Sequence, residues 1–317
     1  MSDIAVLGAG AFGTALALAL SKDGTPVTLW GRDRADIEAM RKERMTGRAL
    51  PGHTLPPALM PTYEIPDAVI FLIAVPAQKV SGFLEQYRAS LDGRVVISCA
   101  KGIEHGTGRG PVEVILHALP TAKAGCLTGP SFAVDIAAGL PTALVLATAK
   151  DDPKLQEKLA RPALRIYRTD DVTGAELGGA LKNVIALAAG MTDGVGLGDS
   201  ARAAVIARGF AEAQRYALSK GARPETLQGL SGIGDLVLTC TSPKSRNYTA
   251  GLSLGRGEAI AEGITVEGIA TAQALAQETT ASDLEMPLAQ TVALVTEGRL
   301  RMDEAINALL SRPAGKE

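Results

Sequence analysis

The chain has 317 residues and a formal net charge of −2, with 46% hydrophobic and 21% charged residues. This balance excludes a disordered chain, and the near-neutral charge argues against nucleic acid as a partner, because its phosphate backbone needs a basic surface. The length exceeds the size at which one hydrophobic core usually stops growing, so we expect two domains.

The N-terminus begins almost at once with an apolar strand, Ile4–Leu7, and no basic region precedes it. The apolar segments of the chain are also too short to span a bilayer. Cys99, Cys126 and Cys240 are widely spaced and form no CxxC pair, which predicts buried reduced thiols instead of disulfides or a zinc site. The sequence therefore predicts a cytoplasmic enzyme with no membrane insertion and no metal.

Up to about residue 170, short apolar segments alternate with segments of helical spacing. We predict strands at Ile4–Leu7, Val27–Trp30, Val69–Ala74, Val95–Cys99, Gly125–Leu127 and Thr142–Ala147. Helices are predicted between them, at Ala11–Lys22, Arg34–Arg44, Gln78–Ser90, Pro111–Leu119 and Asp152–Leu159. Continuous apolar strands alternating with helices indicate the α/β class, with a Rossmann-like, doubly wound parallel sheet.

After Thr173 the chain becomes rich in alanine and shows no strong strand pattern. Helical spacing predicts helices over 176–191, 201–220, 266–278 and 286–296. This change places a boundary between a dinucleotide-binding domain at 1–172 and an all-α, substrate-binding domain at 173–317. The segment 311–317 is predicted to be a loose polar tail.

The first predicted strand runs into a GxGxxG motif that opens a helix. Gly8 permits the tight turn, Gly10 lets a pyrophosphate approach the backbone, and Gly13 lets the helix pack against the strand. The N-terminus of the helix offers free N–H groups and a partial positive charge to phosphates. The motif therefore predicts a dinucleotide cofactor.

The end of the second strand indicates which dinucleotide is preferred. NAD-binding folds usually place an acid there, whereas this chain has Arg32, whose guanidinium suits the 2′-phosphate of NADP. Asp33 leaves the alternative open, since a shift of the strand end would turn it toward the ribose. For Arg34 we favour a solvated position in the first turn of the next helix.

Polar segments follow two further strands, where ligands of parallel sheets bind. Lys101 ends an otherwise apolar strand, which is a poor position for a purely solvating lysine, so we favour a functional role. The segment Gly129–Ala133 follows the strand that ends at Leu127 and falls at the same edge.

The helical part adds a second set of candidates. Lys182 lies in an apolar helix after Gly178 and Gly179, where burial would lower its pKa and suit it to proton transfer. A lysine that reaches solvent from the helix surface is the alternative, and the residues do not decide between the two. Asp235 is either a site residue or a helix N-cap. The segment Ser245–Asn247 either holds a phosphate or is an exposed loop.

These segments occur in a characteristic order, and in that order the chain resembles the bacterial NAD(P)-dependent sn-glycerol-3-phosphate dehydrogenases. The segments are Gly8–Leu16, Cys99–Glu104, Gly129–Ala133, Leu181–Asn183, Gly196–Asp199, Gly232–Ser242, Ser245–Asn247 and Val266–Gly268. The resemblance implies reversible reduction of dihydroxyacetone phosphate to sn-glycerol 3-phosphate for glycerophospholipid synthesis. It also implies a homodimer and a cofactor that is NADPH, our preferred expectation, or NADH.

The resemblance further implies roles for individual residues. Lys182 would donate the proton to the carbonyl oxygen, Lys101 would polarise the carbonyl, and Asp235 would orient the substrate and both lysines. The implied substrate contacts are Lys101, Gly129, Ser131, Lys182, Asp235, Ser245, Arg246 and Asn247. The implied cofactor contacts are Gly8, Gly10, Ala11, Phe12, Gly13, Arg32, Lys101, Ala133, Arg246, Val266 and Glu267.

Three departures and two alternatives accompany the resemblance. In Gly198–Ser200, Ser200 stands where the family commonly has asparagine. Ala11 stands where the family often has serine, and Tyr248–Ala250 stands where the family is often basic, which bears on phosphate affinity. A 3-hydroxyacid dehydrogenase of the 6-phosphogluconate type would share the glycine loop and a helical lysine, but the segments at 129–133 and 245–247 argue against it. A non-catalytic NADP sensor is a further alternative, for which an intact set of Lys101, Lys182 and Arg246 is unexpected.

Overall fold

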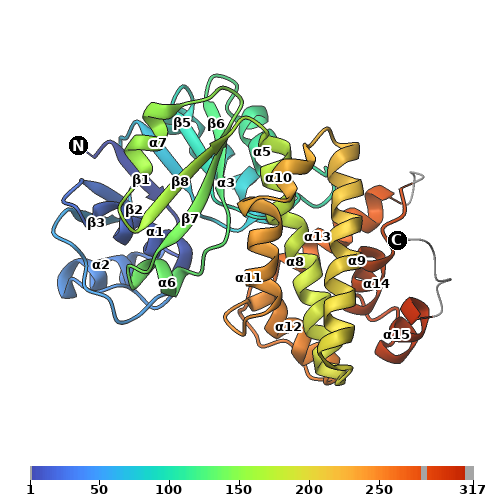
Figure 1. Ribbon diagram of the computed structural model, residues 1–317. Helices are drawn as coiled ribbons and strands as arrows, with labels where there is room; N and C mark the ends of the chain where they lie inside the picture. Colours follow the sequence, from blue (N-terminus) through green and yellow to red (C-terminus); the bar gives the residue numbers. More distant parts are fainter. Residues whose placement is uncertain (1, 280–283, 311–317) are drawn as a thin grey trace.

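The computed structural model describes residues 2–279 and 284–310, in which a sheet domain is followed by a helical domain (Figure 1). The tail predicted at 311–317 lies outside the described residues. Within the described part of the chain, no helix combines the length and the apolarity needed to cross a membrane. The three cysteines are free and buried, as predicted.

The sheet domain contains one eight-stranded sheet in the order β3-β2-β1-β4-β5-β6-β7-β8. The strands are β1 (Ile4–Leu7), β2 (Val27–Trp30), β3 (Leu59–Thr62), β4 (Ile70–Ile73), β5 (Val95–Ser98), β6 (Lys123–Thr128), β7 (Thr142–Thr148) and β8 (Leu164–Thr169). All neighbouring strands are parallel except β6 and β7. The α/β, Rossmann-like class is therefore confirmed, but β7 and β8 run opposite to β1–β6.

Strand β7 runs antiparallel to β6 because the connection between them is short. That connection holds only the short helix α6 (Ala133–Ala137), which at 1.5 Å per residue advances about 7 Å. Strand β6 has six residues and is about 20 Å long. Because α6 is too short to carry the chain back across the sheet, β7 returns antiparallel, and the predicted parallel sheet becomes a mixed one.

Two strands that the sequence analysis did not predict form the edges of the sheet. In β3, Pro61 removes a backbone donor, and proline in a strand is tolerated mainly at an edge. In β8, residues on one face are buried and those on the other are mostly exposed, since only one face is covered by helices. The apolar sequence pattern of both strands is therefore weaker than that of the central strands, which are buried on both faces.

Helices cover both faces of the sheet and bury alternate strand residues. One face, which receives Ile4 and Val6, packs against α1 (Ala11–Ser21), α2 (Arg34–Glu43), α6 and α7 (Pro153–Leu159). The opposite face, which receives Ala5 and Leu7, packs against α3 (Val80–Gln86), α4 (Arg88–Leu91) and α5 (Pro111–Ala118). A short 3₁₀ turn, η1 (Ala77–Lys79), precedes α3.

The second domain is all-α, as predicted, and is organised around one central helix. Its helices are α8 (Val172–Val195), α9 (Gly198–Ser219), α10 (Pro224–Leu227), α11 (Asp235–Cys240), α12 (Arg246–Gly255), α13 (Glu267–Thr279), α14 (Pro287–Thr296) and α15 (Met302–Leu310), with a π-helical turn η2 (Leu230–Gly234) before α11. Helix α8 is buried along most of its length by the helices around it (Figure 1).

Glycines let α8 and α12 approach until their backbones touch. A Cβ on Gly190 would lie 2.0 Å from the carbonyl oxygen of Tyr248, and one on Gly251 would lie 2.0 Å from that of Leu187. Any side chain at either position would therefore separate the helices. This contact fixes the start of α12, which carries the segment Ser245–Asn247, relative to the middle of α8, which carries Lys182.

Candidate functional site

Two lysines meet on one buried carboxylate where the two domains join. Lys101 Nζ lies 2.6 Å from Asp235 Oδ2, and Lys182 Nζ lies 2.9 Å from Asp235 Oδ1. Lys182 also donates to Thr239 Oγ1 at 2.6 Å. Asp235 is 1% exposed and Lys182 is 8% exposed, so the cluster is nearly closed to bulk water.

The charges in this cluster shift one another's proton affinities. Burial lowers the pKa of Lys182 to about 8, and the neighbouring charge of Lys101 acts in the same direction, while Asp235 opposes the shift. Burial would raise the pKa of Asp235, but the charges and hydrogen bonds of Lys101 and Lys182 hold that pKa below its usual value. Asp235 is therefore ionised near neutral pH, and Lys182 exchanges its proton close to that range.

Three separate elements bring the cluster together. Lys101 follows β5 at the carboxyl edge of the sheet, Lys182 lies in the middle of α8, and Asp235 is the first residue of α11, directly after η2. A Cβ on Gly178 would lie 2.6 Å from the carbonyl oxygen of Ser231, so this glycine lets η2 rest on α8. Such π-helical turns are frequent at functional sites.

Two alternatives left open by the sequence are decided by this geometry. The side chain of Asp235 bonds both lysines and does not cap a helix. Lys182 is buried and bonded within the protein, so it does not reach solvent from the helix surface.

The loop after β6 lies against Lys101. Lys101 Nζ donates to the carbonyl oxygen of Gly129 at 2.9 Å, and Ser131 Oγ donates to the same oxygen at 3.0 Å. Thr128 Oγ1 is buried and has no hydrogen-bond partner within the described residues. A Cβ on Gly179 would lie 2.7 Å from this oxygen. The cluster thus contains an unsatisfied polar atom, which buried sites usually reserve for water or a ligand.

A chain of buried amides links Lys101 to the helical domain. Asn183 Nδ2 donates to the backbone oxygen of Lys101 at 3.1 Å, and Asn247 Nδ2 donates to Asn183 Oδ1 at 2.9 Å. Asn247 Oδ1 in turn accepts from the backbone N–H of Gly268 at 2.9 Å. Both polar atoms of the Asn247 side chain therefore hold partners within the protein and support the site.

Arg246 is the side chain of its segment that remains free to meet a ligand. Ser245 is buried and caps α12 by accepting from the backbone N–H of Tyr248 at 3.2 Å. Arg246 begins α12 and is exposed, and no carboxylate of the described chain lies within ion-pair distance of it. Because Arg246 is the first residue of α12, its charge adds to that of the positive end of the helix dipole, and both attract anions.

The glycine loop has the geometry of a phosphate cradle. Gly8 has φ +129°, and a Cβ on it would lie 2.6 Å from the carbonyl oxygen of Ala74. A Cβ on Gly13 would lie 2.0 Å from the oxygen of Gly8, so α1 packs closely on the turn. A Cβ on Gly10 would meet nothing within 4 Å, so open space faces this backbone. Ala11 and Phe12 begin α1 beside it.

The residues after β2 support Arg32 as the group that would meet a 2′-phosphate. Asp33 caps α2 by accepting from Asp36 N at 3.1 Å and also pairs with Arg48, so both of its carboxylate oxygens already have partners within the protein. Arg34 pairs with Glu38 and lies over the ring of Tyr63. Arg32 is exposed, and the described residues contain no acid paired with it.

Glu267 lies where α13 of the helical domain meets the carboxyl edge of the sheet. Its Oε1 accepts from the backbone N–H of Ala77, after β4, at 3.2 Å, and a Cβ on Gly102 would lie 3.2 Å from Oε2. Burial raises its pKa. The neighbouring Val266 is partly buried in the helical core, and Ala133 begins α6, which packs against α1.

Thr239 is a site residue that the sequence analysis did not identify. It lies four positions after Asp235 on α11, on the same face of the helix, and bonds Lys182. The available signal was this spacing, but a threonine in a helix is too common to single out without the lysine beside it.

The described residues contain no group of three or more histidine, cysteine or acidic side chains arranged for a metal.

Comparisons with known proteins agree over almost the full chain. Residues 3–154 match the N-terminal family model of NAD-dependent glycerol-3-phosphate dehydrogenase, and residues 171–307 match its C-terminal model. The glycerol-3-phosphate dehydrogenases (NAD(P)+) of Ruegeria sp. and Paracoccus denitrificans are 54% and 53% identical over 99% of both chains. The crystal structure of glycerol-3-phosphate dehydrogenase from Coxiella burnetii is 35% identical, covers 98% of both chains and has a TM-score of 0.91.

Proposed function

The chain belongs to the NAD-dependent glycerol-3-phosphate dehydrogenase family, and from this premise we propose that it reduces dihydroxyacetone phosphate to sn-glycerol 3-phosphate. The reaction is reversible, and its product supplies glycerophospholipid synthesis. The observation that carries the proposal is the pair of ammonium groups on one buried carboxylate at the domain junction. Family membership disfavours the 3-hydroxyacid dehydrogenase alternative.

The lysine cluster suits the charge changes of carbonyl reduction. When bound, the nicotinamide cofactor supplies the hydride. Negative charge then develops on the carbonyl oxygen, and preorganised cations in a nearly dry site stabilise it. Lys182 is the proton donor, because its pKa of about 8 lets it hold a proton at neutral pH and still release it readily. Lys101 polarises the carbonyl.

Asp235 orients the two lysines, and the loop at Gly129 and Ser131 lines the substrate position. The carboxylate holds one ammonium group on each of its oxygens, which fixes their separation and limits their mutual repulsion. Such positioning lowers the entropic cost of bringing substrate and acid together. The unsatisfied hydroxyl of Thr128 gives this pocket a further hydrogen-bonding group.

We assign the substrate phosphate to the start of α12. Arg246 provides a planar donor group suited to phosphate, and the free N–H groups of the helix N-terminus add to the attraction. Ser245 and Asn247 border this position and hold it in place through their own hydrogen bonds. Tyr248 follows where a basic residue is common in the family, so Arg246 carries most of this charge recognition.

The residues present fit a dinucleotide at the carboxyl edge of β1. The open space in front of Gly10 suits a pyrophosphate, with Gly8, Ala11, Phe12 and Gly13 forming the cradle. Ala133, Val266 and Glu267 would contact the cofactor from the opposite side, together with Lys101 and Arg246. Arg32 favours NADPH over NADH through the 2′-phosphate.

The test is a spectrophotometric assay at 340 nm. The wild-type protein is expected to oxidise NADPH rapidly with dihydroxyacetone phosphate and slowly with unphosphorylated dihydroxyacetone. Lys182→Ala should lower kcat by ~10²–10⁴, the usual contribution of a general acid. Lys154→Ala, which removes an exposed lysine of α7, is the matched control and should match wild type. Tight NADPH binding without turnover would instead favour the sensor alternative.

We further propose that the protein is a cytoplasmic homodimer, on the basis of the family resemblance and of a cofactor and substrate that belong to the cell interior. Sedimentation equilibrium checks the assembly: a mass of about twice the 32.7 kDa of one chain is expected. Cell fractionation checks the location.

A further inference from the structure

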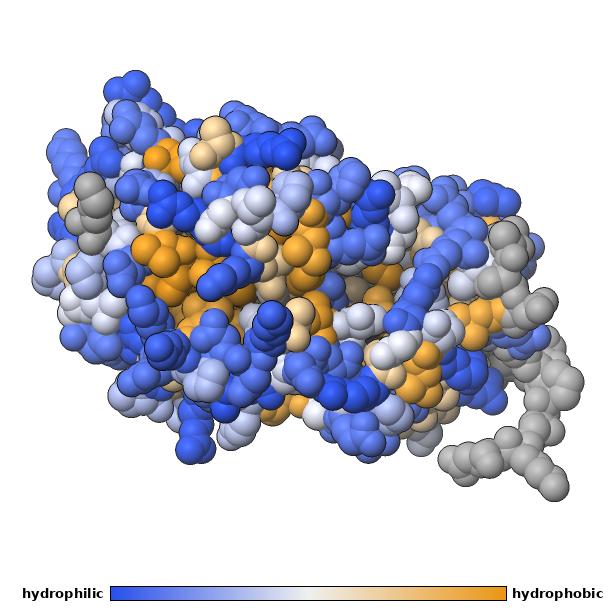
Figure 2. Space-filling model, turned by 90° about the horizontal axis from the view of Figure 1, so that it is seen from above, coloured by the Kyte–Doolittle hydropathy of each residue, from blue (hydrophilic) through white to orange (hydrophobic). Residues whose placement is uncertain are grey.

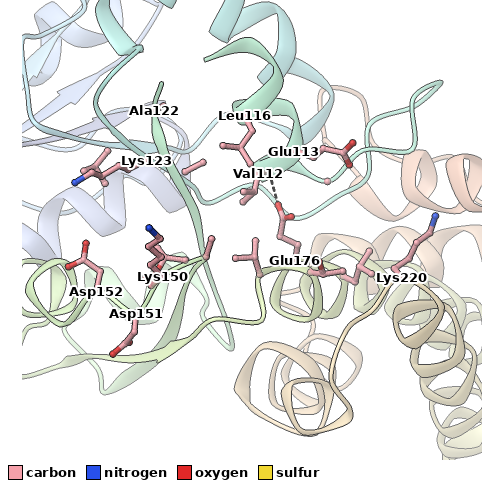
Figure 3. A pocket seen from close by; sticks show the side chains of 18 of the residues that line it. Val112, Glu113, Leu116, Ala122, Lys123, Lys150, Asp151, Asp152, Glu176 and Lys220 are labelled. Atoms are coloured by element: carbon pink, nitrogen blue, oxygen red, sulfur yellow. Dashed lines mark hydrogen bonds between the residues drawn. The ribbon is translucent and has the colours of Figure 1, made fainter. Parts of the chain in front are cut away.

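A large cavity opens at the edge of the sheet opposite the lysine cluster. It measures about 790 Å³, within the ~300–1,000 Å³ typical of small-molecule sites. It lies where β5 and β6 begin, where β7 ends, and beside the first turns of α8 (Figure 3). Glycine-loop residues lie at the other edge, so this cavity is separate from the proposed cofactor site.

The walls of the cavity are mainly apolar. Val95, Leu116, Ala124 and Val172 contribute to them, and Leu116 is 49% exposed. Figure 2 looks onto this end of the molecule and shows apolar side chains gathered in its middle. Exposed apolar surface in a concavity is a frequent mark of a binding site.

Two lysines on the rim have no counter-charge. Lys123 begins β6, and Lys150 follows the end of β7 at Thr148, so both lysines lie at the rim of the cavity. Within the described chain no carboxylate lies within ion-pair distance of either ammonium group. Figure 3 shows both on one side of the cavity.

The other charged side chains that line the cavity already have partners. Lys220 pairs with Glu278, Asp151 pairs with Arg168, and Asp152 caps α7. Glu113 lies 3.6 Å from Arg109. Among the rim groups without an ion-pair partner, Lys123 and Lys150 are positive and Asp152 is negative, so the balance of charge at the rim is positive.

Glu176 does not cancel that charge. Its Oε1 accepts from the backbone N–H of Val112 at 2.7 Å and so caps α5, whose N-cap residue, Gly110, has no side chain. Its Oε2 has no partner within the described residues and adjoins the cavity. Burial raises the pKa of Glu176 to about 8, so the carboxyl group is mostly neutral at pH 7 and can donate a hydrogen bond to an anion.

We infer that this cavity binds a small anionic amphiphile, with its aliphatic chain against the apolar wall and its anionic head between Lys123 and Lys150. Each part of the ligand complements one property of the cavity. The aliphatic chain replaces water on the apolar surface, and the anionic head supplies the negative charge that the two rim lysines lack. Neither feature alone would select this ligand class.

Isothermal titration calorimetry with decanoate tests the inference. One saturable site is expected, and the double variant K123Q/K150Q should weaken binding at least tenfold. Lys154→Gln, a lysine on α7 that does not line the cavity, is the matched control and should bind as wild type does. Decyltrimethylammonium, inorganic phosphate and acetate should bind at least tenfold more weakly than decanoate. Equal affinity in all variants, or no saturation, would overturn the inference.

Two further measurements locate the site. Ala149→Trp places a bulky side chain at the exposed mouth of the cavity and should abolish decanoate binding while leaving the reductase activity unchanged. Saturating NADPH should leave the decanoate affinity unaltered. Displacement of decanoate by NADPH would assign it to the cofactor site and would refute a separate cavity site, whatever the outcome of the activity assay.

Discussion

The two edges of the sheet carry lysine pairs in opposite electrostatic settings. At the carboxyl edge, Lys101 and Lys182 share the buried carboxylate of Asp235. At the other edge, Lys123 and Lys150 line the rim of the cavity, and no carboxylate of the described chain lies within ion-pair distance of either ammonium group. The first pair is held by one shared carboxylate within the protein, and burial lowers the pKa of Lys182, so this pair is suited to proton transfer. The second pair is left to solvent or to an anionic ligand.

The largest expected effect is the loss of stability when the carboxylate shared by Lys101 and Lys182 is removed. Asp235→Asn leaves two buried ammonium groups without a counter-charge, and breaking a buried ion pair typically costs on the order of 3–5 kcal/mol of stability. K123Q/K150Q should change stability by less than about 0.5 kcal/mol, as exposed substitutions usually do. Urea unfolding of both variants and wild type gives the measurement. Similar losses in the two variants would contradict the contrast between the edges.

The pH dependence of turnover tests whether Lys182 is the group that transfers the proton. Ketone reduction needs Lys182 protonated, so kcat should be level below its pKa of about 8 and should fall as the pH rises through that value, approaching tenfold per unit. Oxidation of the alcohol needs the neutral amine and should rise through the same range. Initial rates in both directions from pH 6 to 10 check this. A limb near 8 that persists in Lys182→Ala would assign the titration to another group.

Arg32 is a further cation without an ion-pair partner in the described chain. It is exposed, and its neighbour Asp33 is engaged with α2 and Arg48. Removing a charge-assisted hydrogen bond to a 2′-phosphate costs roughly 1.5–3 kcal/mol. Arg32→Ser should therefore lower kcat/KM with NADPH by roughly ten- to a hundredfold and leave the value with NADH nearly unchanged. Equal losses with both cofactors would argue for a stacking role.

The smallest expected effect concerns the neutral partner of Lys182. Thr239→Val keeps the shape of the side chain but removes the hydroxyl that accepts from Lys182 at 2.6 Å. A hydrogen bond of a charged group typically contributes roughly 1.5–3 kcal/mol, but Asp235 remains as a partner, so a loss of about 1 kcal/mol, or roughly fivefold in kcat, is expected. The midpoint of the pH profile should move in the same variant. A lower kcat with an unmoved midpoint would indicate a purely structural role.

The sequence predicted well those features that a continuous segment determines. The strand, the GxGxxG turn and the first helix are adjacent in the chain, and steric limits on Gly8 and Gly13 fix the turn locally. The central apolar strands are buried on both faces and have an unambiguous pattern. The edge strands β3 and β8 were not predicted, because a proline in one and a half-exposed surface on the other weaken that pattern.

Pairing between distant residues was decided by the tertiary structure alone. Lys101 and Asp235 are 134 positions apart, and no local rule distinguishes a capping aspartate from one that joins two lysines. The burial of Lys182 depends on the helices packed around α8, and the antiparallel turn at β7 depends on the length of α6. The cavity at the far edge likewise exists only once β6, β7 and α8 are assembled. Charge compensation and desolvation are properties of the packed chain. They determine the pKa values and the hydrogen-bond partners of side chains that the sequence identified only as candidates.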